Sequence, residues 1–157
     1  MIEINSILAP TDFSAHSERA VRYACGLADR LQAELHLIHI LSEIIPAGPD
    51  PLLMPVMPPQ FYQENEDRAR ATLEQFRSPE WGNPRSVVTA IRWGGPVEAI
   101  VDYALEHEID LIVLATHGRS GLSHVLLGSV AERIVREAPC PVLTIRDRAR
   151  IAGTVDA

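Results

Sequence analysis

The chain has 157 residues and a formal net charge of −7. A chain of this length fits one domain, and its acidity argues against a general affinity for nucleic-acid backbones, which requires a basic face. All 14 basic residues are arginine, which excludes a lysine Schiff base and the lysine of a P-loop. Any bound phosphate must therefore be held by backbone amides, hydroxyl groups or arginine.

The two cysteines, Cys25 and Cys140, have neither the number nor the spacing of a disulfide framework or a zinc site. The sequence shows no signal peptide and no long apolar span. We therefore expect a cytoplasmic protein with neither a membrane nor a nucleic-acid partner.

The first part of the chain alternates apolar runs with helical periodicity. Residues 4–9 are an apolar run halted by Pro10, which predicts a first strand, and apolar residues then recur at helical spacing up to Leu31. Residues 34–41 predict a second strand, covered on both faces because it shows almost no polar alternation. Six prolines fall within residues 46–59, so regular structure is not expected there.

The same alternation continues to the end of the domain. Three further strands are predicted, over residues 86–92, 111–115 and 142–146. Three further helices are predicted, over residues 60–77, from Pro96 onward and after Gly128. Five strands and four helices in this order predict an α/β fold, a single doubly wound domain with a parallel sheet between helices on both faces. We expect this domain over residues 1–147 and a flexible tail over residues 148–157.

Residues 111–130 combine a buried strand, a glycine-punctuated polar loop and a helix start. The helix start presents backbone N–H groups and the positive end of the helix dipole, which together favour an anion. Ligands of open parallel sheets lie beyond the carboxyl ends of the strands, where the strand order reverses. This segment is therefore the predicted binding region.

The segment resembles the nucleotide loop of the universal stress protein family, whose ATP-binding members carry Gly, two residues, Gly, nine residues, then Gly followed by Ser or Thr. Gly118 takes the second glycine position, residues 119–127 are the nine, and Gly128-Ser129 closes the pattern. Ala115 stands where the motif opens with glycine. The pattern is therefore partial at its first position.

Two other stretches resemble the same family. They are Ala-Pro-Thr-Asp-Phe-Ser at residues 9–14 and Pro-Val-Leu-Thr-Ile at residues 141–145, so the resemblance extends from about Asn5 to Arg146. It implies strand order 3-2-1-4-5 and a site for ATP or another adenine nucleotide, with Mg²⁺ as the ion that would bridge the phosphates. The implied nucleotide contacts are Pro10, Thr11, Asp12, Ile40, Ala115, Thr116, His117, Gly118, Arg119, Gly121, Gly128, Ser129 and Val130. The resemblance also implies a homodimer through the last strand, by Val142, Leu143, Thr144, Ile145 and Arg146.

Several site residues have a second, purely structural interpretation. Gly118 and Gly128 are either turn glycines with positive φ or points where backbone amides approach phosphate oxygens. Ser129 and Glu132 have the spacing of a capping box, so the Ser129 hydroxyl bonds either the Glu132 amide or a phosphate. Asp12 is either a site residue or the cap of the first long helix.

Two further positions carry alternatives. Arg119 is either a solvated loop charge or a phosphate partner. The methyl group of Ala115 either crowds the ligand or is tolerated, and alanine is acceptable to the backbone if φ is negative. His36 and His39 stand three apart on one strand and must point to opposite faces, so no metal site is expected from them.

Two functional hypotheses follow. The first is a nucleotide-binding stress-response protein with a regulatory role and slow or no hydrolysis, because no positioned general base is evident. The second is a nucleotide-free interaction protein of the same fold, in which Ala115 has closed the site. An ATP-consuming enzyme of the related pyrophosphatase type is disfavoured, since residues 9–12 lack the Ser-Gly-Gly loop of those enzymes.

Overall fold

The computed structural model describes residues 3–42, 57–117 and 127–146. Its strands are β1 (Ser6–Pro10), β2 (Glu34–Leu41), β3 (Ser86–Trp93), β4 (Leu111–Ala115) and β5 (Val142–Ile145). Its helices are α1 (Ala15–Leu31), α2 (Pro59–Phe76), α3 (Pro96–Glu106) and α4 (Ser129–Glu137), with a short 3₁₀ helix η2 (Pro79–Trp81). The predicted α/β alternation is therefore confirmed within these ranges.

The five strands form one parallel sheet in the order β3-β2-β1-β4-β5, as predicted. The strand order reverses between β1 and β4, which pair directly through Ile7 and Leu111. The carboxyl ends of these two strands, at Pro10 and Ala115, therefore meet at one edge of the sheet.

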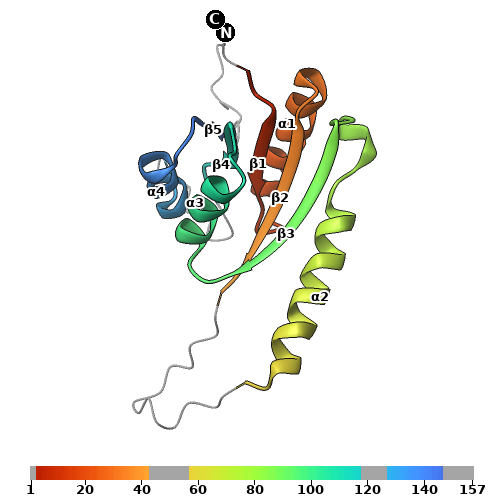
Figure 1. Ribbon diagram of the computed structural model, residues 1–157, viewed down its shortest axis with the longest axis vertical. Coiled ribbons are helices and arrows are strands. Elements are labelled where there is room, and N and C mark those ends of the chain that lie inside the picture. The colour runs from red at the N-terminus through yellow and green to blue at the C-terminus, as the bar shows by residue number, and fades with distance from the viewer. Residues whose placement is uncertain (1–2, 43–56, 118–126, 147–157) are drawn as a thin grey trace, which may run out of the picture.

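Helices cover both faces of the sheet (Figure 1). On one face α1 and α2 bury a core that includes Val21 and Leu73, and on the other face α3 and α4 bury a core that includes Tyr103 and Ile134. β1, β2 and β4 are almost wholly buried, which explains their continuous apolar sequence.

Several limits of the strands and helices differ from the prediction by one or two residues, and one short helix was not predicted. Pro10 extends β1 by one residue, because the amide of Thr11 continues the ladder to the carbonyl of Ile38 at 2.9 Å. The predicted loop over residues 78–84 contains η2, in which Pro79 occupies the first turn and the Ser78 side chain caps it. Most of the proline-rich segment and the tail over residues 148–157 lie outside the described residues.

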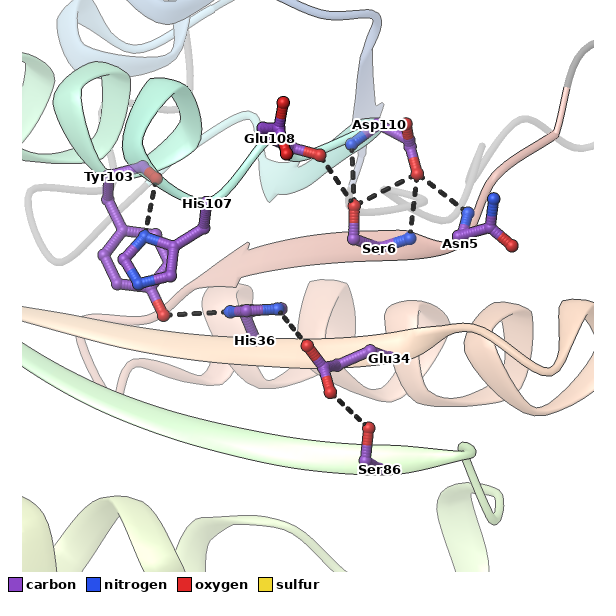
Figure 2. A network of polar contacts seen from close by, with 9 residues as sticks. All are labelled: Asn5, Ser6, Glu34, His36, Ser86, Tyr103, His107, Glu108 and Asp110. Atoms are coloured by element: carbon purple, nitrogen blue, oxygen red, sulfur yellow. Dashed lines mark hydrogen bonds and ion pairs between the residues drawn. The ribbon is translucent and has the colours of Figure 1, made fainter.

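A buried polar cluster lies at the amino end of β2, between the sheet and α3 (Figure 2). His36 Nε2 lies 2.9 Å from Glu34 Oε1, and Nδ1 lies 2.9 Å from the Tyr103 hydroxyl. Because an ionised carboxylate only accepts, Nε2 carries the proton and the Tyr103 hydroxyl donates to Nδ1. The hydroxyl of Ser86 donates to the other oxygen of Glu34.

The same cluster shifts the acidity of its members. Burial lowers the pKa of His36, although the neighbouring Glu34 carboxylate opposes this. The hydrogen bond from Ser86 lowers the pKa of Glu34, and His36 adds to that effect. At neutral pH the cluster therefore holds a carboxylate and a neutral imidazole.

Asp110 joins the amino ends of β1 and β4 (Figure 2). Its carboxylate accepts hydrogen bonds from the backbone amides of Asn5 at 2.8 Å and Ser6 at 3.0 Å. Burial alone would raise the pKa of Asp110, but these hydrogen bonds outweigh it and leave the pKa low. Both polar groups lie at the sheet end opposite to the strand ends at Pro10 and Ala115.

Within the described ranges, no helix combines the length and the hydropathy that crossing a bilayer requires.

Candidate functional site

A cavity of about 570 Å³ opens at the carboxyl ends of β1, β2 and β4 and at the starts of α3 and α4. This is the edge at which the strand order reverses, where the fold class places ligands. The volume falls within the range of roughly 300 to 1,000 Å³ that is typical of small-molecule sites. The cavity is lined by Pro10, Thr11, Asp12, Ser17, His39, Ile40, Leu41, Ser42, Pro96, Ile100, Leu114, Ala115, Thr116, His117, Gly128, Ser129, Val130, Ala131 and Ile134.

The structure brings most of the predicted site residues together around this cavity. Those that line it are Pro10, Thr11, Asp12, Ile40, Ala115, Thr116, His117, Gly128, Ser129 and Val130. Gly118, Arg119 and Gly121 lie outside the described residues. The contact of these residues with a nucleotide stays a prediction.

The loop between β1 and α1 forms one wall. The Thr11 hydroxyl shares a 2.9 Å hydrogen bond with the hydroxyl of Ser17. Asp12 Oδ1 accepts from the backbone amide of Ser14 at 3.0 Å, and the Ser14 side chain accepts from the Ser17 amide at 3.2 Å. Ser14 is therefore the cap of α1, and Asp12 instead closes a turn that positions that cap.

The junction of β4 and α4 forms the opposite wall. The amide of Gly128 donates to the carbonyl of Thr116 at 2.7 Å. Gly128 has φ −67° and ψ 154°, so the alternative of a positive-φ turn glycine is wrong at this position. A Cβ atom on Gly128 would lie 3.0 Å from the Thr116 carbonyl oxygen. This contact is tight, so the close approach of the two backbone segments favours glycine here.

The capping box predicted for Ser129 does not form. Gly128 is the cap of α4 without a side-chain bond, Ser129 is the first helical residue, and the Glu132 amide donates to the Gly128 carbonyl at 2.9 Å. The Glu132 carboxylate instead pairs with Arg136 at 2.7 Å. Ser129 is exposed, and the first turn of α4 turns its amides and the positive end of its dipole to the cavity.

Ala115 is the last residue of β4, and its partner in the sheet is Ile145. It is not among the described non-glycine residues with positive φ. The backbone therefore accepts alanine at this position, and the methyl group can affect only the space of the cavity.

A second, shallow recess lies against the same end of β4. It is lined by Ala115, Thr116, His117, His16, Arg19, Ile145 and Arg146. The rings of His16 and His117 lie 6.4 Å apart. The two arginines bring positive charge close to the cavity of an acidic protein.

Some lining residues were not predicted from the sequence. They are Ser17, His39, Leu41, Ser42, Pro96, Ile100, Leu114, Ala131 and Ile134. Some of them could have been predicted from the expected sheet order, because His39 and Leu41 flank the predicted Ile40 at the end of β2 and Ser42 follows that strand. Pro96 follows β3, whose carboxyl end lies at the same edge.

His36 and His39 point to opposite faces of the sheet, as predicted. His36 contacts Tyr103 of α3, whereas His39 stacks on Phe13, which itself contacts Phe76 of α2. Within residues 3–42, 57–117 and 127–146, no group of three His, Cys, Asp or Glu side chains is arranged to hold a metal ion.

Comparisons with known proteins agree with this architecture. The model of the Universal stress protein family matches residues 3–146. The chain is 33% identical over 144 residues to a universal stress protein of Methanocaldococcus jannaschii, a match that covers 89% of this chain and 81% of that protein. The solved structure of the universal stress protein UspA from Lactobacillus plantarum superposes with a TM-score of 0.76 at 30% identity, covering 93% of this chain and 100% of the other.

A further solved structure is that of a universal stress protein in complex with cAMP. It superposes with a TM-score of 0.59 at 26% identity and covers 92% of this chain and 98% of the other. Family model, sequence relatives and solved structures thus agree over nearly the whole length, and the chain belongs to the universal stress protein family.

Proposed function

We propose that the cavity binds an adenine nucleotide, with ATP as the first candidate, and that the protein acts as a regulatory member of the stress response. The observation that carries this proposal is the meeting of the β1 loop and the start of α4 around one cavity of about 570 Å³. These two segments lie more than a hundred residues apart in the sequence, and each belongs to a stretch that resembles the family.

The phosphates would lie at the start of α4. Backbone amides of Ser129 and Val130 and the dipole of the helix suit an anion there, whereas the Gly128 amide is held by the Thr116 carbonyl. The chain has no lysine, so amides, hydroxyl groups such as that of Thr116, and arginine are proposed to carry this contact. Gly118, Arg119 and Gly121 are proposed to complete the phosphate loop.

The base and ribose would lie on the opposite side, against Pro10, Thr11 and Asp12. Apolar side chains such as Ile100 and Leu114 line the cavity, and backbone groups of Ile40 suit the edge of adenine. The related protein in complex with cAMP carries an adenine nucleotide, which supports this class of ligand.

Mg²⁺ would be held mainly by the phosphates and water. The carboxylate that lines the described cavity is that of Asp12, and it already accepts the amide of Ser14 at 3.0 Å. Mg²⁺ in nucleotide sites keeps several waters and needs only one or two protein carboxylates, so this arrangement fits the ion. Hydrolysis is proposed to be slow or absent, and turnover at roughly 1 to 1,000 per second would contradict a regulatory role.

We also propose a cytoplasmic homodimer that pairs through β5. This strand is one edge of the sheet, and its residues Val142–Ile145 are only partly buried. The exposed N–H and C=O groups of an edge strand favour pairing with a second copy. Light scattering after size exclusion tests this, and a monomer at all micromolar concentrations would contradict it.

Isothermal titration calorimetry with ATP and AMP tests nucleotide binding. We expect a Kd tighter than about 1 mM, which corresponds to about −4 kcal/mol. Gly128→Val should weaken binding at least tenfold, because its side chain would meet the Thr116 carbonyl. The control is Gly26→Ala in α1, where a Cβ atom meets its nearest neighbour at an ordinary 3.6 Å and the cavity is not touched.

The alternative is a nucleotide-free interaction protein of the same fold. The observation in its favour is the Ala115 side chain, which stands at the first motif glycine and lines the cavity. In that case wild-type protein shows no binding, and Ala115→Gly restores it. Equal, measurable binding by wild type and Ala115→Gly would exclude this alternative.

A further inference from the structure

His39 lies behind the loop that forms the base side of the cavity. It is nine-tenths buried at the end of β2 and is itself one of the lining residues. Its Nδ1 atom lies 2.8 Å from the backbone carbonyl oxygen of Thr11. Because a carbonyl only accepts, Nδ1 must carry the hydrogen, which fixes the tautomer of a neutral ring.

This bond completes a clamp on Thr11. The amide of Thr11 donates to the carbonyl of Ile38 at 2.9 Å, so both backbone groups of Thr11 are held by β2. The chain is thus fixed at the point where it leaves the sheet and begins to line the cavity.

The same imidazole supports the next turn of the loop. Phe13 has φ +63°, in the left-handed region that a phenylalanine rarely adopts. Its ring stacks on His39 with centroids 4.2 Å apart and also packs edge-on against Phe76 at 5.3 Å. Such a backbone conformation persists only when surrounding contacts over-determine it, and the aromatic stack is one of these contacts.

We propose that His39 is a positioning residue of the nucleotide site. Its Nδ1–H group and its ring hold Thr11 and Asp12 in the conformation that the ligand meets, so affinity depends on His39 through the loop. This inference rests on the proposed nucleotide binding and adds a residue that the family's loop pattern does not contain. Its role is separable into a hydrogen bond and a ring stack.

Two substitutions separate these contributions. His39→Phe keeps an aromatic ring against Phe13 and removes the donor to Thr11, whereas His39→Asn keeps a donor near the Nδ1 position and removes the ring. We expect His39→Phe to weaken ATP and AMP binding at least tenfold in calorimetry, and His39→Asn to stay within about threefold of wild type. A residue that merely filled space would show the opposite order.

The matched control is His36→Phe, on the same strand and equally buried but on the other face. It should lower stability and leave nucleotide affinity within about twofold. If His39→Phe binds as wild type does, or if His39→Asn is no better than His39→Phe, the inference is overturned while the proposed function stands. If wild type binds neither nucleotide, the proposed function fails.

Nuclear magnetic resonance of the ligand-free wild type tests the positioning itself, even where a variant fails to fold. The ¹⁵N signals of the His39 ring should show the hydrogen on Nδ1, and the amide of Thr11, whose carbonyl loses its donor in His39→Phe, should exchange faster in His39→Phe than in His39→Asn. A hydrogen on Nε2 with a bare Nδ1, or equal exchange in the two variants, would overturn the inference.

Discussion

Replacement of Tyr103 by phenylalanine removes one atom from the buried cluster at the amino end of β2. Tyr103 is 1% exposed and His36 is 4% exposed, so neither water nor a surface side chain readily replaces the lost hydroxyl. The phenylalanine ring keeps the packing of the original, including the stack on His107 at a centroid distance of 3.9 Å. The substitution therefore isolates the 2.9 Å hydrogen bond to His36 Nδ1.

The expected cost follows from what the substitution leaves behind. An acceptor buried without its donor costs roughly 1–3 kcal/mol, more than the net value of a typical hydrogen bond. We expect a loss of about 2 kcal/mol in the free energy of unfolding. In a domain of this size each kcal/mol lowers Tm by roughly 2–4 °C, so Tm should fall by about 4–8 °C.

Urea unfolding followed by circular dichroism measures this change. Tyr62→Phe is the control, because Tyr62 is 41% exposed. The control should stay within about 0.5 kcal/mol of wild type. Equal midpoints for the two variants would show that the His36–Tyr103 bond does not stabilise the fold, and the cluster would then need another explanation.

Three further outcomes are expected. Burial lowers the pKa of His36, so the unfolded chain binds a proton more readily than the folded protein does, and stability should fall as the pH drops below about 6.5. The midpoint of urea unfolding should therefore change less between pH 7.5 and 5.5 in His36→Gln than in the wild type. Gly82→Ala should cost roughly 2–4 kcal/mol in the same assay, because φ is +137° and the new Cβ would lie 2.8 Å from the Cys25 carbonyl; a cost below 1 kcal/mol would refute this. Ser14→Ala removes the side-chain oxygen that caps α1 by accepting from the Ser17 amide, and it should lower the free energy of unfolding by about 1 kcal/mol. An unchanged Tm in thermal unfolding would contradict this.

The fold could be predicted because its signals are local and mutually consistent. The limits of β2 and β4 were predicted to the residue, at 34–41 and 111–115, because buried parallel strands appear as continuous apolar runs. The strand order followed from the family resemblance and is confirmed. Helix η2 was missed because three residues give no periodicity, although the pair Ser78-Pro79 was a visible start signal.

The candidate site was only partly accessible from the sequence. Residues within the two loops were found because glycine and capping residues mark them. His39 was considered only as a metal ligand, since its hydrogen bond to Thr11 joins β2 to the loop after β1 and no spacing within one strand predicts it. The capping box failed by one position, because Gly128 and not Ser129 occupies the cap of α4.

The two described glycine positions of the motif, Ala115 and Gly128, meet different physical demands. Both have ordinary backbone conformations, so neither requires glycine for its φ angle. At Gly128 a side chain would meet the Thr116 carbonyl oxygen at a tight 3.0 Å, and that close approach favours glycine. At Ala115 the chain runs as a regular strand beside Ile145, and the methyl group leaves that pairing intact. The departure from the motif therefore acts on the volume of the cavity and not on the path of the chain.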